Sequence, residues 1–145
     1  MKDINNAEIN FRHRVPVQIR FNDIDMFGHL NNTVYLQFFD MGKYAYFRSF
    51  MDGPFGSEPT APVVANINVD FHKPTFIDEK LTVCTAVTEI AESSMVMQQV
   101  IINEKGTIKC SARVVMVNVD VKTGLPVPVT REWRDKLGAY ENRNF

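Results

Sequence analysis

Hydrophobic and polar residues alternate along two stretches of this chain, which is the pattern of strands with one buried face. The alternation runs through residues 15–21 and again through residues 63–72, until Pro74 ends it. Three further stretches have the length and composition of strands: residues 81–90, 94–103 and 107–119. A turn signal between Asn103 and Gly106 separates the last two. The spacing predicts about five strands joined as an antiparallel meander.

One segment, residues 33–51, is apolar on nearly every side when it is drawn as a helix. Its apolar residues are Val34, Tyr35, Leu36, Phe38, Phe39, Met41, Tyr44, Ala45, Tyr46, Phe47, Phe50 and Met51. A helix of this kind is buried nearly all round. Gly42 costs on the order of 1 kcal/mol relative to alanine inside a helix, so its presence predicts a close approach to a neighbouring strand.

These elements predict an α+β fold in which an antiparallel sheet curls around one long buried helix. Residues 120–128 contain two prolines and a Thr-Gly pair and have the composition of a loop. Thr130 is placed to cap a short C-terminal helix over residues 131–140. We expect a single domain over residues 1–145. A sheet curled on one side leaves its other face or its edge to be covered, which predicts self-association.

Composition and charge exclude several classes of protein. The chain has 145 residues, of which 45% are hydrophobic, enough to build a core in one domain. Its 16 basic and 17 acidic residues give a formal charge of -1, which argues against binding nucleic acid or an anionic membrane by bulk electrostatics. The first residues lack the apolar core of a signal peptide, and no window is apolar enough to span a bilayer. We therefore expect a cytoplasmic protein.

The two cysteines, Cys84 and Cys110, lie inside apolar, strand-like stretches. Neither has neighbours at the spacing of metal ligands, so we predict no metal site and two reduced core thiols. A disulfide between adjacent strands stays open from the sequence, although it would be unusual in a cytosolic protein.

The segment with the most reactive side chains joins the first strand to the long helix. It runs from Arg20 to Tyr35 and has the sequence RFNDIDMFGHLNNTVY. It places Asp23, Asp25 and His29 near the free N–H groups of a helix N-terminus, where developing negative charge is stabilised. Such a junction is suited to an active site.

The order of elements around this segment resembles a known enzyme family. A strand leads into the motif Asp-x-Asp-x-x-Gly-His-x-Asn-Asn-x-x-Tyr, which begins at Asp23, and a buried helix follows. The meander then contains Val-Asp-Phe-His-Lys-Pro, ending at Pro74. This order resembles the hot-dog-fold acyl-CoA thioesterases of the 4-hydroxybenzoyl-CoA thioesterase type, from about Val15 to Pro128.

The GHxNNxxY part of the motif also resembles the corresponding loop of acyl-ACP thioesterases, which share the hot-dog fold. Those enzymes commonly have an asparagine two residues after the aspartate, where this chain has Phe27. Their polar network therefore does not transfer intact, which favours the simpler mechanism of the CoA enzymes.

The resemblance implies a set of site residues. Asp25 stands at the position of the catalytic carboxylate, which either attacks the thioester carbonyl or activates water. Asn32 stands where a backbone N–H polarises the thioester oxygen, and Gly28 stands where a side chain would crowd the thioester. Related enzymes lay CoA on a surface formed partly by a second subunit, which implies a homodimer or a homotetramer.

The chemistry of thioester hydrolysis supports the same assignment. The reaction passes through a tetrahedral intermediate whose oxygen is negative, and a backbone N–H at a helix N-terminus is a fixed donor for it; losing one such donor costs roughly 10² to 10³ in rate. The chain has no Gly-x-Ser-x-Gly motif, and neither cysteine lies beside a plausible base in the sequence. A carboxylate route remains.

Several of these residues also have purely structural interpretations. Asp25 can close an Asx-turn, and we expect Asp23 to be structural because two ionised carboxylates so close would raise one another's pKa. The side chains of Asn31 and Asn32 are suited to capping the helix, worth about 1 kcal/mol. His29 stays open between a catalytic role, substrate orientation and a local hydrogen bond.

Other candidates are open in the same way. Tyr35 and Phe38 either line the acyl pocket or belong to the core. His72 and Lys73 either contact the phosphates of CoA or form a solvated strand end.

The sequence thus predicts an acyl-CoA thioesterase that acts without a cofactor on acyl-CoA or acyl-ACP. One alternative is a hot-dog dehydratase or hydratase, in which His29 would act as the base beside an acid. Another is a non-catalytic acyl-CoA-binding module, which the lack of an appended helix-turn-helix makes the weaker hypothesis. We predict neither nucleic acid nor membrane as a partner.

Overall fold

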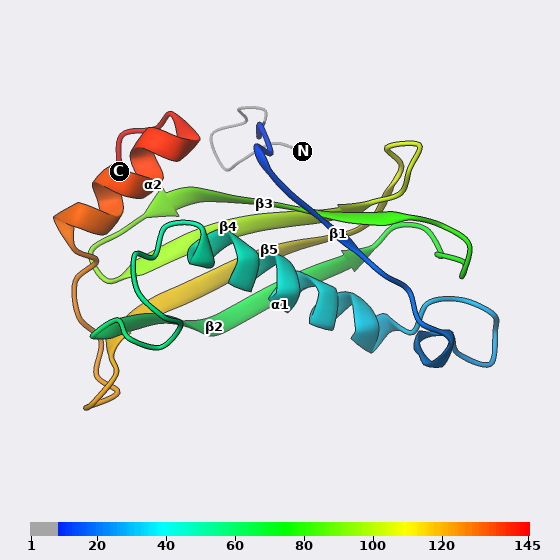
Figure 1. Cartoon of the computed structure of the whole chain (residues 1–145), viewed down its shortest axis with the longest axis horizontal. Coiled ribbons are helices and arrows are strands. Elements are labelled where there is room, and N and C mark those ends of the chain that lie inside the picture. The colour runs from blue at the N-terminus through cyan, green and yellow to red at the C-terminus, as the bar shows by residue number, and fades with distance from the viewer. Residues whose placement is uncertain (1–8) are drawn as a thin grey trace.

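Five antiparallel strands form one sheet in the order β1-β3-β4-β5-β2, and the helix α1 lies along one face of it (Figure 1). The computed structural model describes residues 9–145. The elements in chain order are β1 (His13–Val17), a 3-10 turn (Phe21–Asp23), α1 (Asn32–Arg48), β2 (Thr60–Phe71), β3 (Leu81–Ile90), β4 (Ser94–Ile102), β5 (Ile108–Asp120) and α2 (Arg131–Glu141). This confirms the predicted α+β hot-dog arrangement.

The central strands follow the predicted meander closely. Strand β3 pairs with β4, and β4 pairs with β5, each antiparallel and each joined by a short turn. The two edge strands complete the sheet: β1 pairs with β3 in an unbroken register, and β2 pairs with β5. Each of the pairs β2–β5, β3–β4 and β4–β5 contains one register shift, which lies between Val64 and Asn66 in β2. The β2 edge of the sheet carries no further strand from residues 9–145.

The first strand is shorter than the alternation predicted. It ends at Val17, and the chain then turns into the 3-10 helix that begins at Phe21. Phe21 is 83% exposed, so the prediction that it continues the apolar face of the strand is wrong. The reason is that Asp23 draws the chain into a tight turn after Arg20, whose backbone N–H donates to the Asp23 carboxylate.

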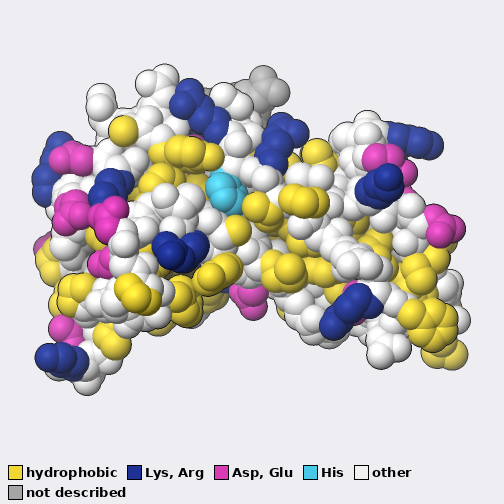
Figure 2. Space-filling view, in the orientation of Figure 1, with side chains coloured by type: hydrophobic (Ala, Val, Ile, Leu, Met, Phe, Trp, Pro, Cys, Tyr) yellow, Lys and Arg dark blue, Asp and Glu magenta, His cyan; other side chains and the backbone are white. Residues whose placement is uncertain are grey.

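The prediction that α1 is buried nearly all round also needs correction. Its inner side packs against β1, β3 and β4 and buries Val34, Phe38, Phe39 and Tyr46 among other residues. Its outer side leaves Met41 and Tyr44 about half exposed, because the sheet covers only one side of the helix. Figure 2 shows hydrophobic side chains spread over this face of the molecule.

Gly42 allows the close approach that its place in the helix predicted. A Cβ atom there would lie 2.5 Å from Cγ1 of Val83 and 3.2 Å from both Nε2 of Gln99 and Oγ1 of Thr85. The contacts are thus with side chains of β3 and β4, on which α1 rests.

The end of the chain and the cysteines agree with the predictions. Thr130 caps α2 by accepting a hydrogen bond from the N–H of Trp133 at 3.3 Å. Cys84 and Cys110 are free and buried, and burial raises the pKa of the Cys110 thiol to about 12. Within residues 9–145, neither helix is long and apolar enough to cross a membrane. The signal-peptide expectation rests partly on residues 1–8, which lie outside the described residues.

Candidate active site

The loop between β1 and α1 is held at its start by Asp23. This carboxylate is 2% exposed and accepts hydrogen bonds from the backbone N–H of Arg20 at 2.8 Å and from its guanidinium at 2.9 and 3.3 Å. The bonds from Arg20 hold the pKa of Asp23 below its ordinary value, although burial acts in the other direction. The carbonyl of Asp23 also accepts the N–H of Asn31 at 2.8 Å. Asp23 thus has the structural role predicted for it.

Asp25 lies at the tip of this loop and is partly exposed. Its Oδ1 accepts the N–H of Phe27 at 2.9 Å and that of His29 at 3.4 Å, which is the Asx-turn geometry considered from the sequence. Its Oδ2 has no hydrogen-bond donor anywhere in residues 9–145. The turn therefore orients the carboxylate while one oxygen stays available.

Gly28 follows Asp25 in the same turn. Its φ of +79° is a conformation that residues with a side chain rarely adopt, and its N–H donates to the carbonyl of Asp25 at 3.0 Å. A Cβ atom at Gly28 would meet no atom within 4 Å. The backbone conformation therefore requires glycine here, and the expected crowding of a substrate stays a prediction.

The helix α1 begins directly after this loop. Asn31 is its N-cap: Oδ1 of Asn31 accepts the N–H of Thr33 at 3.0 Å and the Thr33 hydroxyl at 2.8 Å. Asn32 is the first residue of the helix, and its N–H finds no acceptor among the residues that the structure describes. An unpaired N–H at the positive end of a helix is a ready donor to an anionic oxygen.

An open cavity of about 220 Å³ lies between this loop and the segment that follows β2. Its lining residues come from segments about 40 residues apart: Asp25, His29, Leu30, Asn32, Tyr35, Phe71, His72, Lys73 and Pro74. Six of the seven residues predicted from the sequence therefore share one cavity. Gly28 is the exception, since it shapes the turn behind the cavity without lining it.

The aromatic residues at the cavity divide between wall and core. Tyr35 is 3% exposed and donates its hydroxyl to Oγ1 of Thr75 at 2.8 Å, and burial raises its pKa. Its ring meets that of Phe71 edge to face at a centroid distance of 5.7 Å. Phe38 is 4% exposed and belongs to the hydrophobic core, the second of its two predicted roles.

The two histidines at the cavity have different surroundings. The ring of His29 lies edge to face with that of Phe76 at 5.2 Å between centroids. Nε2 of His72 lies 2.7 Å from the hydroxyl of Ser111 on β5. Residues 9–145 contain no group of three His, Cys, Asp or Glu side chains placed to hold a metal ion.

Sequence reasoning missed four residues of the cavity and its support: Leu30, Phe71, Pro74 and Thr75. Leu30 and Phe71 adjoin predicted site residues, which is the signal that could have found them. Nothing in the sequence indicates that Thr75 bonds to Tyr35, because this contact joins residues 40 positions apart.

Comparisons with known proteins show the family to which the chain belongs. A sequence model of the thioesterase-like superfamily matches residues 19–137. The chain is 27% identical over 133 residues to the long-chain acyl-CoA thioesterase FadM of Escherichia coli, which covers 86% of this chain and 96% of FadM. It is 28% identical over 109 residues to the acyl-CoA thioester hydrolase YbgC of E. coli, covering 74% of this chain and 81% of YbgC.

Solved structures show the same likeness in three dimensions. A thioesterase of Thermus thermophilus, solved in complex with coenzyme A and zinc, superposes with a TM-score of 0.80 at 26% identity, covering 91% of this chain and 96% of that one. A DHNA-CoA thioesterase of Staphylococcus aureus has a TM-score of 0.74 at 21% identity, covering 89% of this chain and 88% of that one, and shows the shared fold alone.

Proposed function

The chain belongs to the thioesterase-like superfamily, and from this premise we propose that it is an acyl-CoA thioesterase, which hydrolyses an acyl thioester to a free acid and CoA. One observation carries the proposal. Asp25 and Asn32 line the same cavity, where one carboxylate oxygen and one helix N–H are both without a protein partner in residues 9–145. These are the two groups that hydrolysis of a thioester requires.

Each group has a definite task in the reaction. Oδ2 of Asp25 either removes a proton from the water that attacks the carbonyl carbon, or attacks that carbon itself. The carbonyl oxygen becomes negative as the new C–O bond forms, and the N–H of Asn32 stabilises it. The C–S bond then breaks and CoA leaves as a thiolate. When Asp25 acts as the base, the proton that it took from water passes to this thiolate and the free acid is released; when Asp25 attacks directly, the acyl group stays on Asp25 as a mixed anhydride, and a water molecule hydrolyses it to the free acid, restores the carboxylate and protonates the thiolate. Oδ1 of Asp25, held by the loop N–H groups, keeps the carboxylate aimed during these steps.

The other cavity residues would hold the substrate. Lys73 is exposed at the end of β2 and can pair with a phosphate of CoA, and His72 lies next to it. Tyr35 forms the wall near the helix start, and His29 lines the same cavity with its ring against that of Phe76. We assign His29 to orienting the substrate or the loop and not to a second chemical step.

The free, buried cysteines agree with the cytoplasm as the compartment that we propose for the protein.

A second copy of the chain would complete this site. The cavity of about 220 Å³ is open and smaller than a typical ligand pocket of about 300 Å³ or more, so a single chain leaves an acyl group largely in water. The long strand β2 ends at this cavity, and its free edge can pair with β2 of another copy. We therefore propose a homodimer as the smallest working unit, from which a homotetramer can be built.

The proposed function is tested by measuring thiol release from a panel of acyl-CoA esters of different chain length, aromatic esters included. We expect release by the wild-type protein and a loss of about 10² to 10⁴ in kcat for Asp25→Asn, since the carboxylate acts as base or nucleophile. Asp78→Asn is the matched control, because Asp78 is an exposed carboxylate on the neighbouring connection and should leave kcat unchanged.

Three outcomes would contradict the proposal. Near wild-type turnover by Asp25→Asn would remove the carboxylate from the mechanism. Binding of acyl-CoA without thiol release for any ester would indicate a binding module. Loss of the enoyl absorbance of crotonyl-CoA without thiol release would indicate a hydratase. If the enzyme does release thiol, a single turnover in ¹⁸O-labelled water tests the direct route: label in the Asp25 carboxylate shows direct attack, because water can add to the aspartyl carbon only when a mixed anhydride has formed.

A further inference from the structure

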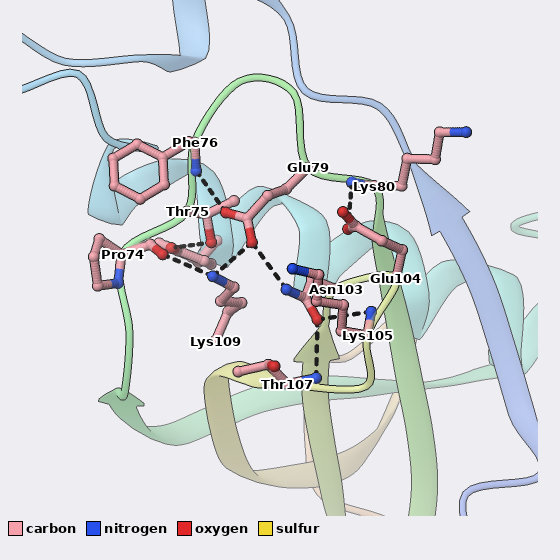
Figure 3. Close-up of polar contacts among 11 residues, drawn as sticks. Pro74, Thr75, Phe76, Glu79, Lys80, Asn103, Glu104, Lys105, Thr107 and Lys109 are labelled. Carbon is pink, nitrogen blue, oxygen red and sulfur yellow. Dashed lines mark hydrogen bonds and ion pairs between the residues drawn. The ribbon is translucent and has the colours of Figure 1, made fainter.

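An ion pair between a buried lysine and a partly buried glutamate holds the connection between β2 and β3, which forms one wall of the cavity. Nζ of Lys109, at the start of β5, lies 2.7 Å from Oε1 of Glu79, and the two side chains are 8% and 17% exposed (Figure 3). The same ammonium group donates to the carbonyl of Pro74 at 2.9 Å. One cation on the sheet therefore fixes both the beginning and the end of this connection.

Glu79 is held by further hydrogen bonds on both of its oxygens. Oε1 also accepts the side-chain amide of Asn103 at 2.9 Å, and Oε2 accepts the N–H of Phe76 at 2.8 Å. Burial is the largest single influence and raises the pKa of Glu79, but the bonds from Lys109, Asn103 and Phe76 together outweigh it and leave the pKa below its ordinary value. Glu79 is thus an ionised carboxylate in a fixed orientation.

The same connection also supports, through Thr75, the loop between β1 and α1 that carries Asp25. Thr75 follows Pro74 directly and is fully buried. Its carbonyl accepts the N–H of Leu30 at 2.8 Å, and its hydroxyl oxygen accepts the hydroxyl of Tyr35 at 2.8 Å. Leu30 and Tyr35 lie on either side of Asn32 in the sequence, so Thr75 sets where the start of α1 lies relative to the sheet.

Stability is a weak reason for burying such a pair. A buried ion pair is often no more stabilising than apolar residues of the same size, because both ions lose their hydration. Its hydrogen bonds do have fixed directions, and those of Lys109 and Glu79 converge on the backbone of the connection at Pro74 and Phe76. The pair therefore determines a position in space more than it determines a free energy of unfolding.

We propose that Lys109 and Glu79 are positioning residues of the active site, which hold Thr75 in place and thereby set the Asn32 N–H against the Asp25 carboxylate. Neither side chain lines the cavity, so their effect on the reaction passes through Thr75, Leu30 and Tyr35. This inference rests on the proposed thioesterase function for its kinetic consequence, but the structural coupling can be measured without any turnover.

The test compares Lys109→Met and Glu79→Gln with the wild-type protein in acyl-CoA hydrolysis and in amide hydrogen exchange. A displacement of about 1 Å at a reacting group can cost about 10²-fold in rate, so we expect kcat to fall about 10- to 100-fold while KM changes less than about threefold. We also expect faster exchange in residues 72–80 and, through Thr75, in residues 24–31.

Glu141→Gln is the matched control. Glu141 is also a partly buried carboxylate that accepts the hydroxyl of Tyr46 at 2.6 Å and the N–H of Val87 at 3.2 Å, but it lies beyond the C-terminal half of α1. Neutralising it should leave both kcat and the exchange of residues 24–31 unchanged. A fall in kcat equal to that of Glu79→Gln would mean that any buried carboxylate matters equally, and would contradict the proposal.

The double variant Lys109→Met/Glu79→Leu decides the matter if a single variant fails to fold, because it leaves no unpaired charge in the interior. We expect it to fold, to exchange residues 24–31 faster and to keep the reduced kcat. Recovery of wild-type kcat, or unchanged exchange of residues 24–31, would overturn the positioning role. If the wild-type protein releases no thiol, the proposed function fails, while the exchange measurement still tests the coupling.

Discussion

Two aspartates two positions apart, Asp23 and Asp25, differ in burial and in hydrogen bonding, and so we propose a structural role for the first and a catalytic role for the second. Asp23 is buried and takes three hydrogen bonds from Arg20, whereas Asp25 is partly exposed and keeps Oδ2 free among residues 9–145. The resemblance of the motif to the thioesterase family indicated Asp25 as the catalytic carboxylate that we propose. That Asp25 uses one oxygen for the turn and leaves the other available follows only from the fold of the loop.

Asp23 gives a prediction at this scale. Its pKa is lowered in the folded protein, so its ionised form contributes stability above its ordinary pKa near 3.8, and this contribution disappears as the pH falls through the lower folded value. Asp23→Asn should therefore lower the free energy of unfolding at pH 7, with the difference from wild type shrinking at pH 3. Urea denaturation at both pH values measures it; an equal difference at both would contradict it.

At the scale of elements, the periodic patterns located most strands and both helices. The strand predicted over residues 81–90 is β3 (Leu81–Ile90). Strand β4 and helix α2 differ from prediction by one residue at one end, and β5 differs by one residue at each end. The failures lie at β1, on the outer side of α1 and on the predicted buried face of β2. In all three the side chains suggested burial. A hydrogen-bonded turn at Asp23 ends β1 early, the sheet covers only one side of α1, and β2 is an edge strand that is largely exposed.

The start of α1 carries the second prediction. Asn31 caps the helix through Thr33, and its loss should cost about 1 kcal/mol of the free energy of unfolding. Because the next N–H, that of Asn32, is the proposed oxyanion donor, Asn31→Ala should also lower kcat. Thr130→Ala removes the cap of α2, far from the cavity, and serves as the control: it should lose similar stability but no activity. Equal kcat in both variants would contradict a role for this helix start.

At the scale of the whole molecule, the exposed apolar surface is the main feature that a single chain leaves unexplained. Val63, Val64 and Ile67 on β2 are each more than a third exposed, as are Met41 and Tyr44 on α1. The alternation in β2 predicted one buried face, but in one chain this strand is an edge, and α1 packs against β1, β3 and β4 instead. A second copy paired along β2 would cover this surface.

This assembly gives the third prediction. Ile67→Lys places a charge at the proposed interface, so the protein should sediment as a monomer and lose most of its thioesterase activity, since each cavity then lacks its cover. Leu125→Lys introduces the same charge at an exposed apolar residue of the loop after β5 and should leave the assembly unchanged. Sedimentation velocity and thiol release provide the measurements. A monomeric wild-type protein with full activity would contradict the proposed dimer.

The sequence by itself determined the elements and their order, because strand alternation, helix periodicity, turn residues and the Asp23–Tyr35 motif are all local properties of the chain. It also singled out seven candidate residues, and the structure brings six of them together in one cavity. Only the tertiary structure decided how that cavity is built: the free Oδ2 of Asp25, the Thr75 contacts and the Lys109–Glu79 pair. These three features depend on contacts between residues distant along the chain or on the path of the loop. Neither kind of information produces a periodic pattern in the sequence, so the sequence could not predict them.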